Sequence, residues 1–302
     1  MGSMPARHAL LLAVGVVAVG FAAIFIRLAD APSLSIAFYR NAIAAAILLP
    51  VAAARRSGEI RRLTRAQVTI VLVSGAFLAL HFATWISSLA LTSVAASVVL
   101  VTSAPVFTAA AGRLFFGQRV GRSVATGIAV ALVGTAVITG GDLAVAGSAA
   151  LGDLLALCGA IAGAGYFIAG GRLRQDVSAL AYAAVVYATC ALILLPCTLA
   201  TGSRLTGFSG KTWAMLVLLA LVPQILGHTT FNYLLRDLDP TLIAVAIMGE
   251  PVVSTLLAVA FFGQIPSGWT ILGGVLVLAG IYVAITGQRW VAAASVPPEP
   301  NG

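Results

Sequence analysis

The chain has 302 residues, of which 61% are hydrophobic and only 9% are charged, and its mean hydropathy is +1.07. Soluble domains carry about 25% charged residues, so this composition excludes a soluble fold and indicates a polytopic membrane protein. The pI is near 10.1. We nevertheless expect no nucleic-acid partner, because the sequence has no aromatic–basic binding pattern and its arginines follow a membrane topology.

Apolar runs of about 20 residues, separated by clusters of charge, proline or glycine, predict an all-α fold of ten transmembrane helices in the lipid bilayer. The predicted helices are 9–28, 34–53, 66–91, 94–114, 122–140, 151–171, 178–200, 212–235, 240–262 and 267–287. The tail 289–302 is rich in proline, so we expect it to be disordered and cytoplasmic.

The same pattern occurs twice in the chain, at an offset of 146 residues. The aligned segments are Pro105-Val106 with Pro251-Val252, F-F-G-Q at 115–118 with F-F-G-Q at 261–264, I-L-L-P at 47–50 with I-L-L-P at 193–196, and Gly127, Gly134 and Gly141 with Gly273, Gly280 and Gly287. Two tetrapeptides in one register indicate a tandem duplication, a common device of transporter folds. We therefore expect two repeats, 9–140 and 151–287.

The positive charges predict how the repeats are oriented. If the N-terminus is cytoplasmic, most of the 17 lysines and arginines fall in cytoplasmic segments, so both termini are expected inside. Each repeat has five helices, an odd number, so the second repeat must be inverted relative to the first. In such folds the substrate site lies near the membrane midplane, between the repeats.

Polar and aromatic residues inside the predicted helices mark a candidate substrate cavity. The third helix places His81, Trp85 and Ser88 on one face, and the eighth nearly does so with His228, Phe231 and Asn232. In the repeat register Trp85 corresponds to Phe231, whereas His81 falls opposite Gly227, one position short of His228. We expect both faces to line one central cavity; the alternative for each residue alone is packing or bridging between helices.

Glu250 and Pro251 interrupt an otherwise apolar helix. A carboxylate at a helix centre costs about 2.5 to 3.5 kcal/mol on insertion scales, so it usually faces a protein interior or a wet cavity. Proline leaves the carbonyl of Ile247 without its helical donor. We therefore regard Glu250, Pro251 and the equivalent Pro105 as candidates for coupling or gating.

Two further segments are candidates for the cavity or for gating. Tyr166 stands among glycines in G-A-G-Y-F-I-A-G-G, so Gly163 and Gly170 are candidate positions for a flexible gate around an aromatic contact. For other intramembrane glycines, such as Gly127 and Gly134, close approach of helices is the favoured role. Tyr39 and Arg40 open the second helix; Arg40 can hold a substrate carboxylate, but its place near the helix start favours snorkelling or a structural pair.

Other chemistry is not indicated. Cys158, Cys190 and Cys197 lie in apolar runs and are expected to be small buried hydrophobic residues, with no metal site and no cofactor. The sequence contains no G-x-x-x-x-G-K-[ST], H-E-x-x-H or G-x-S-x-G motif, which argues against an ATP site and against an enzyme. A monomer is compatible with these features.

These residues resemble a known family. Ten helices in two halves, the Pro-Val helices ending in F-F-G-Q, glycines seven apart in the last helix of each half, and Phe38-Tyr39-Arg40 are similar to EamA-type transporters of the drug/metabolite transporter superfamily, over residues 10–288. Within it the chain looks most similar to the YddG-type amino-acid exporters. The resemblance implies a multi-pass secondary transporter of the bacterial inner membrane, which exports aromatic and other small amphipathic amino acids by alternating access.

Alternatives remain for the substrate and for Glu250. A cationic-drug/proton antiporter needs an intramembrane acid, which Glu250 supplies, and a carrier of sugar phosphates or nucleotide sugars needs several cations, of which only Arg40 is available. Glu250 can bind a substrate ammonium, couple protons or pair with a neighbouring helix. The G-E-P pattern is shared by family members with unlike substrates, which favours a structural or gating role. Gln118 and Gln264 stand where the family commonly has glutamate.

Overall fold

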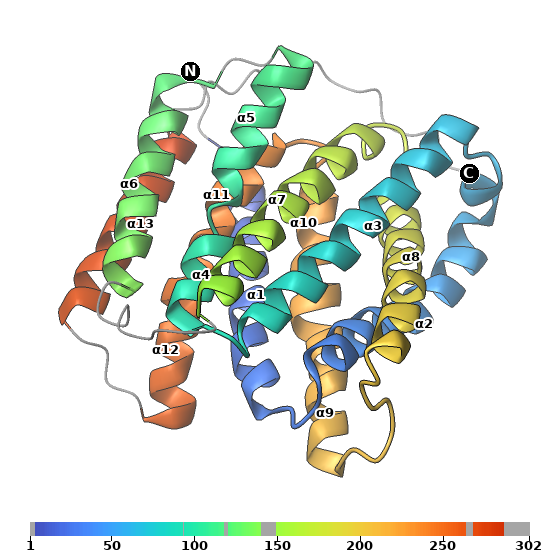
Figure 1. The fold of residues 1–302 in the computed structure, drawn as a ribbon. Helices are drawn as coiled ribbons and strands as arrows, with labels where there is room; N and C mark the ends of the chain where they lie inside the picture. The colour runs from blue at the N-terminus through green and yellow to red at the C-terminus, as the bar shows by residue number, and fades with distance from the viewer. Residues whose placement is uncertain (1–3, 93, 118–119, 140–148, 264–267, 287–302) are drawn as a thin grey trace.

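The structure is a computed structural model that describes residues 4–92, 94–117, 120–139, 149–263 and 268–286, and every regular element in these ranges is helical (Figure 1). The first half contributes α1 (Ala6–Leu28), α2 (Ser33–Arg61), α3 (Arg65–Ser88), α4 (Val94–Val101), α5 (Ala104–Phe116) and α6 (Arg122–Thr139). The second half contributes α7 (Ala149–Leu173), α8 (Ala179–Ala200), α9 (Gly210–Leu219), the π-helix η1 (Ala220–His228), α10 (Thr229–Leu234), α11 (Pro240–Ile247), α12 (Glu250–Phe262) and α13 (Gly268–Thr286). The predicted tail, 289–302, lies outside the described residues.

Two of the predicted long helices are each divided in the structure. The helix predicted over 94–114 is broken between α4 and α5, and the helix predicted over 240–262 is broken between α11 and α12. Pro105 and Pro251 are each the second residue of the new helix, where a missing backbone N–H leaves no hydrogen bond unmade. The prolines therefore begin helices rather than kink them.

The segment predicted as the eighth helix, 212–235, contains nine π-helical residues, Ala220–His228, between α9 and α10. The turn includes Pro223, and its last residue is His228. π-Helical turns are rare and often occur at functional sites, because the wider turn accommodates an additional residue and rotates the following side chains.

The sequence also misplaced the end of the second helix. α2 continues beyond residue 53 to Arg61, through arginines that were expected in a loop. Non-helical dihedral angles at Arg56 (φ −134°, ψ 18°) mark a kink at the start of this extension. The extension carries its arginines on an exposed surface.

The repeated F-F-G-Q segment has a structural reason at its glycine. Gly117 follows α5 with φ 62°, and Gly263 follows α12 with φ 65°. A residue in the left-handed conformation after the last helical turn lets its backbone N–H donate to a carbonyl of that turn. Glycine adopts this conformation without strain. Gln118 and Gln264 lie outside the described residues.

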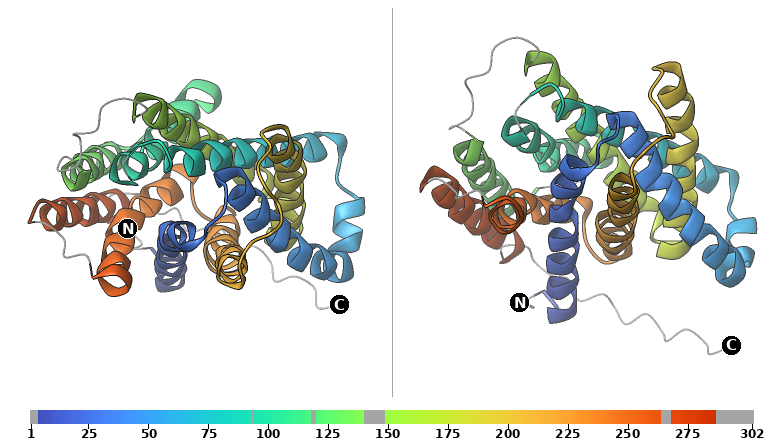
Figure 2. Two further views of the ribbon diagram at one scale, coloured as in Figure 1. Left: turned by 60° about the horizontal axis from the view of Figure 1, so that its bottom comes forward. Right: turned by 90° about the horizontal axis from the view of Figure 1, so that it is seen from below.

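The glycines spaced seven apart allow α6 and α13 to touch. The two helices lie side by side at one edge of the bundle in Figure 1 and Figure 2. A Cβ at Gly127 would lie 2.5 Å from the Gly280 carbonyl oxygen, and one at Gly134 would lie 2.6 Å from that of Gly273. Because 127 and 134 correspond to 273 and 280 at the offset of 146, the contact is reciprocal, as a two-fold axis between the two helices requires.

The other large contacts follow the same reciprocal pattern. In the repeat register, α7 corresponds to α1, the segment that contains η1 corresponds to α3, and α12 corresponds to α5. In one direction α3 and α5 pack against α7, and in the other η1 and α12 pack against α1. α2 packs against α8, its own counterpart. Most buried hydrophobic residues form one cluster between these elements, so the two halves share a core.

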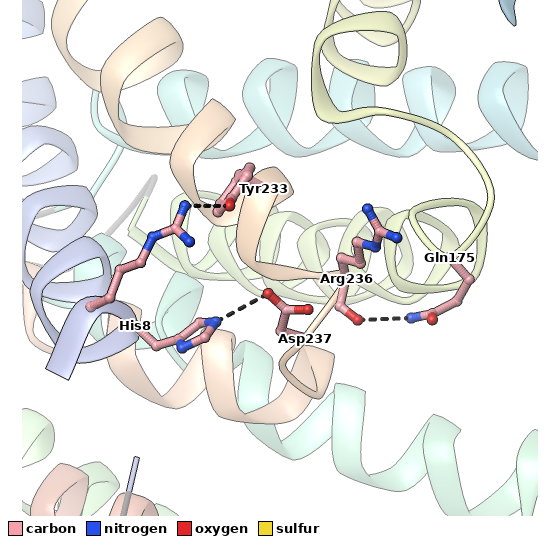
Figure 3. Close-up of polar contacts among 6 residues, drawn as sticks. His8, Gln175, Tyr233, Arg236 and Asp237 are labelled. Carbon is pink, nitrogen blue, oxygen red and sulfur yellow. Dashed lines mark hydrogen bonds and ion pairs between the residues drawn. The ribbon is translucent and has the colours of Figure 1, made fainter. Parts of the chain in front are cut away.

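Polar contacts join the halves at both ends of the bundle. At the end that holds the start of α1, Arg7 Nη2 donates to Tyr233 Oη at 2.6 Å, and His8 Nε2 lies 3.0 Å from Asp237 Oδ2 (Figure 3). At the opposite end, Ser35 Oγ donates to the Arg204 carbonyl at 2.7 Å and Tyr39 Oη donates to the Leu205 carbonyl at 2.6 Å.

Seven helical segments in the described residues are long and apolar enough to cross a membrane. They are Ala6–Leu28, Ser33–Arg61, Arg65–Ser88, Ala150–Leu173, Ala179–Ala200, Gly210–Leu234 and Pro240–Phe261. Two shorter apolar helices occur at Arg122–Val137 and Ile271–Thr286. The fold is therefore that of an all-helical membrane protein.

Candidate functional site

A cavity of about 50 Å³ lies where the two broken helices meet. Its described lining residues are Val19, Ala22, Arg40, His81, Trp85, Val101, Thr102, Ala104, Gly163, Phe167, His228, Ala244, Ile247 and Glu250. Residues on both sides of the α4–α5 and α11–α12 breaks line it, together with residues of α1, α2, α3, α7 and η1. This volume holds a few water molecules, so a larger ligand requires the walls to move.

Arg40 is buried in the wall of this cavity, with only 1% of its surface exposed. Its Nε donates to Gln224 Oε1 at 2.9 Å, and its guanidinium carbon lies 3.9 Å from the centroid of the Phe82 ring. The side chain therefore does not snorkel to the surface, which was one of the two roles that its sequence position favoured. Instead it is held by a hydrogen bond and a cation–π contact.

Gln224 positions Arg40 from the π-helix η1. Its Nε2 donates to Asn41 Oδ1 at 3.1 Å, and Asn41 Nδ2 donates in turn to the Ala37 carbonyl at 2.9 Å. Tyr187 Oη donates to the Gln224 carbonyl at 3.3 Å. All of these groups are buried, so the network gives the guanidinium one orientation.

His81 and Trp85 form an aromatic wall on α3. The His81 Nδ1 donates to the Gly159 carbonyl at 2.8 Å, and the His81 and Trp85 rings stack with centroids 5.9 Å apart. A Cβ at Gly163 would lie 3.0 Å from His81 Nδ1, so this glycine gives the imidazole its space. His228 faces the cavity from η1, with its ring 5.4 Å from Phe82.

Three hydrogen-bonding atoms on the cavity residues have no partner among the described residues: Arg40 Nη1, Trp85 Nε1 and His228 Nδ1. Arginine and tryptophan nitrogens only donate, and the histidine nitrogen donates or accepts according to its tautomer. Buried polar atoms are nearly always hydrogen-bonded in folded proteins. All three residues line this cavity, which makes it the candidate site for a polar ligand.

Glu250 supplies the acidic group of the cavity. It is the first residue of α12, where a carboxylate interacts favourably with the positive end of the helix dipole. Its side chain lines the cavity and is 8% exposed, and it forms no ion pair within 4.0 Å in the described part of the chain. The cavity wall thus contains one guanidinium and one carboxylate that do not bind each other directly.

Of the residues predicted for the cavity, the structure brings Arg40, His81, Trp85 and His228 together there, and the others lie elsewhere. Ser88 Oγ, at the end of α3, is 2.5 Å from Ser97 Oγ in α4. Tyr39 lies at the end of the bundle, hydrogen-bonded to the loop before α9.

Tyr166, Asn232 and Phe231 are buried beside the cavity rather than in its wall. Tyr166 Oη donates to Asn232 Oδ1 at 2.6 Å, which joins α7 to α10. Phe231 packs on α1, where a Cβ at Gly15 would lie 2.5 Å from its ring. These three side chains are buried behind the residues that line the cavity.

The predicted gating residues divide in the same way. Glu250 and Gly163 line the cavity, and Pro251 and Pro105 directly follow lining residues at the two breaks. Gly170 lies against Tyr182 instead, since a Cβ there would be 2.7 Å from its hydroxyl oxygen. α7 is a continuous helix through both glycines.

The sequence interpretation missed several residues of the wall. Val101 and Ala104 correspond to Ile247 and Glu250 at the offset of 146, so the repeat itself contained the signal for both. Phe167, which the same register aligns with Phe21, lines the cavity as well. No short-range pattern points to Gln224, because its partner Arg40 is 184 residues away.

The cysteines play no part in this site. Cys190 is buried as predicted, Cys158 is partly buried and Cys197 is exposed, which corrects its predicted burial. All three are free thiols. In the described ranges, no group of three histidine, cysteine or acidic residues is arranged to hold a metal ion.

Comparison with known proteins gives consistent results. Residues 7–140 and, separately, 150–286 match the EamA-like transporter family. The "Probable amino-acid metabolite efflux pump" of Salmonella typhimurium is 29% identical over 204 residues, which are 64% of this chain and 68% of that protein. The "Uncharacterized inner membrane transporter YedA" of Escherichia coli K12 is also 29% identical over 204 residues, 66% of this chain and 65% of that protein. One crystal structure, 21% identical, superposes with a TM-score of 0.76 and covers 93% of this chain and 98% of its own, so it shares the fold.

Proposed function

This chain belongs to the EamA-like transporter family, and from that premise we propose that it exports amino acids, aromatic ones among them, by alternating access of two inverted halves. The predicted family is thereby confirmed. The chain is a transporter rather than an enzyme, and its many apolar helices place it as a multi-pass protein of the bacterial inner membrane.

The observation that carries the proposed substrate is the chemistry of the cavity. Its wall is mostly apolar and aromatic, with a few isolated polar groups: the guanidinium of Arg40, the indole of Trp85, the imidazole of His228 and the carboxylate of Glu250. Small-molecule sites have this composition, in which apolar surface holds the ligand and a few polar groups orient it. An amphipathic amino acid meets both requirements.

The proposed topology has ten spans, with both termini in the cytoplasm and the halves 9–140 and 151–287 inverted. The shorter helices α6 and α13 have 18 and 19 residues. At about 1.5 Å per residue these lengths give about 27 to 29 Å, close to the hydrocarbon thickness of a bilayer. The broken α4–α5 segment crosses as a pair of half-helices, as discontinuous helices do at transporter substrate sites.

Contacts at both ends of the bundle support the proposed alternating access. The cavity is small, and polar contacts tie the halves together both at His8 with Asp237 and at Tyr39 with Leu205. A substrate can enter only when one of these sets of contacts opens. The arrangement corresponds to an occluded state between inward-open and outward-open conformations.

Counterflow in proteoliposomes tests the proposal. Vesicles loaded with unlabelled phenylalanine should transiently accumulate labelled phenylalanine from outside, because a carrier exchanges substrates and a passive channel does not. Vesicles loaded with a sugar phosphate should give no exchange, since Arg40 is the only described cation in the cavity wall. Accumulation with none of the amino acids would refute the proposed function.

Glu250 favours a second candidate, a cationic-drug/proton antiporter, because a buried acid is the group that such a protein requires. Arg40 in the same wall opposes it, since a cation alone in the cavity would be repelled. Counterflow with a quaternary amine distinguishes the two candidates: exchange of the amine without exchange of any amino acid would establish the antiporter.

A further inference from the structure

We propose that the cavity recognises the zwitterionic backbone of an α-amino acid, with Arg40 and Trp85 binding the carboxylate and Glu250 binding the ammonium group. The inference rests on the proposed function and adds to it a charge requirement. A ligand with only one of the two charged groups, an amine or a carboxylic acid of the same side chain, should be a poor substrate.

Arg40 is prepared for a carboxylate. Its Nε is occupied by Gln224 and its face by Phe82, which fixes the plane of the guanidinium, while Nη1 has no described partner. Guanidinium groups bind carboxylates through planar, charge-assisted hydrogen bonds. The Trp85 Nε1, a donor without a described partner in the same wall, adds a neutral hydrogen bond.

The helix break between α4 and α5 adds positive potential to the cavity wall. α5 begins at Ala104, a lining residue, and its first turn has neither an acidic residue nor a capping side chain. The equivalent start of α12 contains Glu250. Helix N-termini are partly positive, so an uncompensated one favours an anion. The α11–α12 break therefore contributes the negative charge of Glu250, and the α4–α5 break contributes an uncompensated positive helix end.

Glu250 has no cation within ion-pair distance among the described residues. A carboxylate accepts hydrogen bonds and does not donate them, and Arg40, the cation in the same cavity, forms no ion pair with it within 4.0 Å. A ligand with an ammonium and a carboxylate on one carbon satisfies both poles at once. A ligand with a single charge leaves the opposite pole buried and uncompensated, which is strongly unfavourable.

The test uses three ligands that share one aromatic side chain: phenylalanine, phenethylamine and 3-phenylpropionate. The purified full chain is titrated with each, and binding is followed by ligand-induced thermal stabilisation and by counterflow competition. The wild-type protein should bind phenylalanine at least about tenfold more tightly than either analogue, because each analogue lacks one charge-assisted hydrogen-bonded group.

Two variants assign the poles. Arg40→Gln should lower the affinity for phenylalanine by about tenfold or more and leave the affinity for phenethylamine unchanged or improved. Glu250→Gln should also lower the affinity for phenylalanine by about tenfold or more, but should leave the affinity for 3-phenylpropionate unchanged or improved. Arg174→Gln is the matched control: Arg174 is a buried arginine that donates to the Asn232 and Val177 carbonyls and lies outside the cavity wall. This control should keep the wild-type preference for phenylalanine.

The outcomes separate this inference from the proposed function. If wild-type protein exchanges phenylalanine but binds phenethylamine or 3-phenylpropionate equally well, the charge requirement is wrong and the transporter proposal stands. If it exchanges no amino acid, the proposed function itself fails. The wild-type measurements with the three ligands decide the charge requirement even if a variant does not fold. Gln224→Glu keeps both Arg40 and Glu250 but places a competing carboxylate next to Arg40, so it should weaken phenylalanine binding.

Discussion

Gly134→Ala tests the close contact between the two halves at α6 and α13. A Cβ at position 134 would lie 2.6 Å from both the Gly273 carbonyl oxygen and the Val277 amide nitrogen. These are backbone atoms, so no side chain can turn aside, and the two helices must separate. Overpacking of this kind costs about 1 to 3 kcal/mol.

The matched control is Gly274→Ala on α13, where the nearest atom to a new Cβ is Val252 Cγ2 at 3.7 Å, an ordinary contact. Both variants gain the higher helix propensity of alanine, so the difference between them isolates the steric effect. The assay is the temperature at which half of the detergent-purified protein loses its monodisperse elution peak. We expect a clear decrease for Gly134→Ala and none for Gly274→Ala. Equal temperatures for the two variants would refute the packing argument.

Three further predictions follow from the account. A reporter in the segment 55–65 should be cytoplasmic and one in the loop 202–211 periplasmic; finding both on one side would contradict the inverted repeat. Trp85→Ala should reduce phenylalanine transport more than alanine transport, because ring stacking contributes about 0.5 to 1.5 kcal/mol beyond area burial, whereas equal losses in counterflow would indicate a packing role. His8→Ala removes the contact to Asp237 and should increase maleimide labelling of a cysteine introduced in the cavity wall as Ala104→Cys, from the cytoplasmic side; unchanged labelling would show that this contact does not close the bundle.

The sequence predicted the positions of the helical segments because hydrophobic length and charge are local properties. Pro105 and Pro251 marked both helix breaks, although the prolines begin new helices rather than disturb continuous ones. The same reasoning explains why the broken and π-helical segments were expected as single helices. The segments 94–114, 212–235 and 240–262 are predominantly apolar, and hydrophobicity does not distinguish a continuous α-helix from a divided one.

The candidate cavity was predicted only in part, for physical reasons that differ between residues. His228 was one position out of register with His81, and it is the last residue of the π-helix, whose wider turns orient side chains differently from those of an α-helix. Phe231 shares a helical face with His228 in the sequence but packs on Gly15, a contact 216 residues away that no periodicity reveals. The position of Arg40 near the helix start left snorkelling and a structural pair open, and only its distant partner Gln224 shows that the side chain is held inside the protein.

We propose that one cavity at the helix breaks opens alternately to the two sides of the membrane. Ala104→Cys tests it most directly, in a chain whose three native cysteines are replaced, because Ala104 is a small residue of the cavity wall. A membrane-impermeant maleimide should label this cysteine from either side, and phenylalanine should slow labelling from both. Labelling from one side only, whether phenylalanine is absent or added to either side, would contradict alternating access.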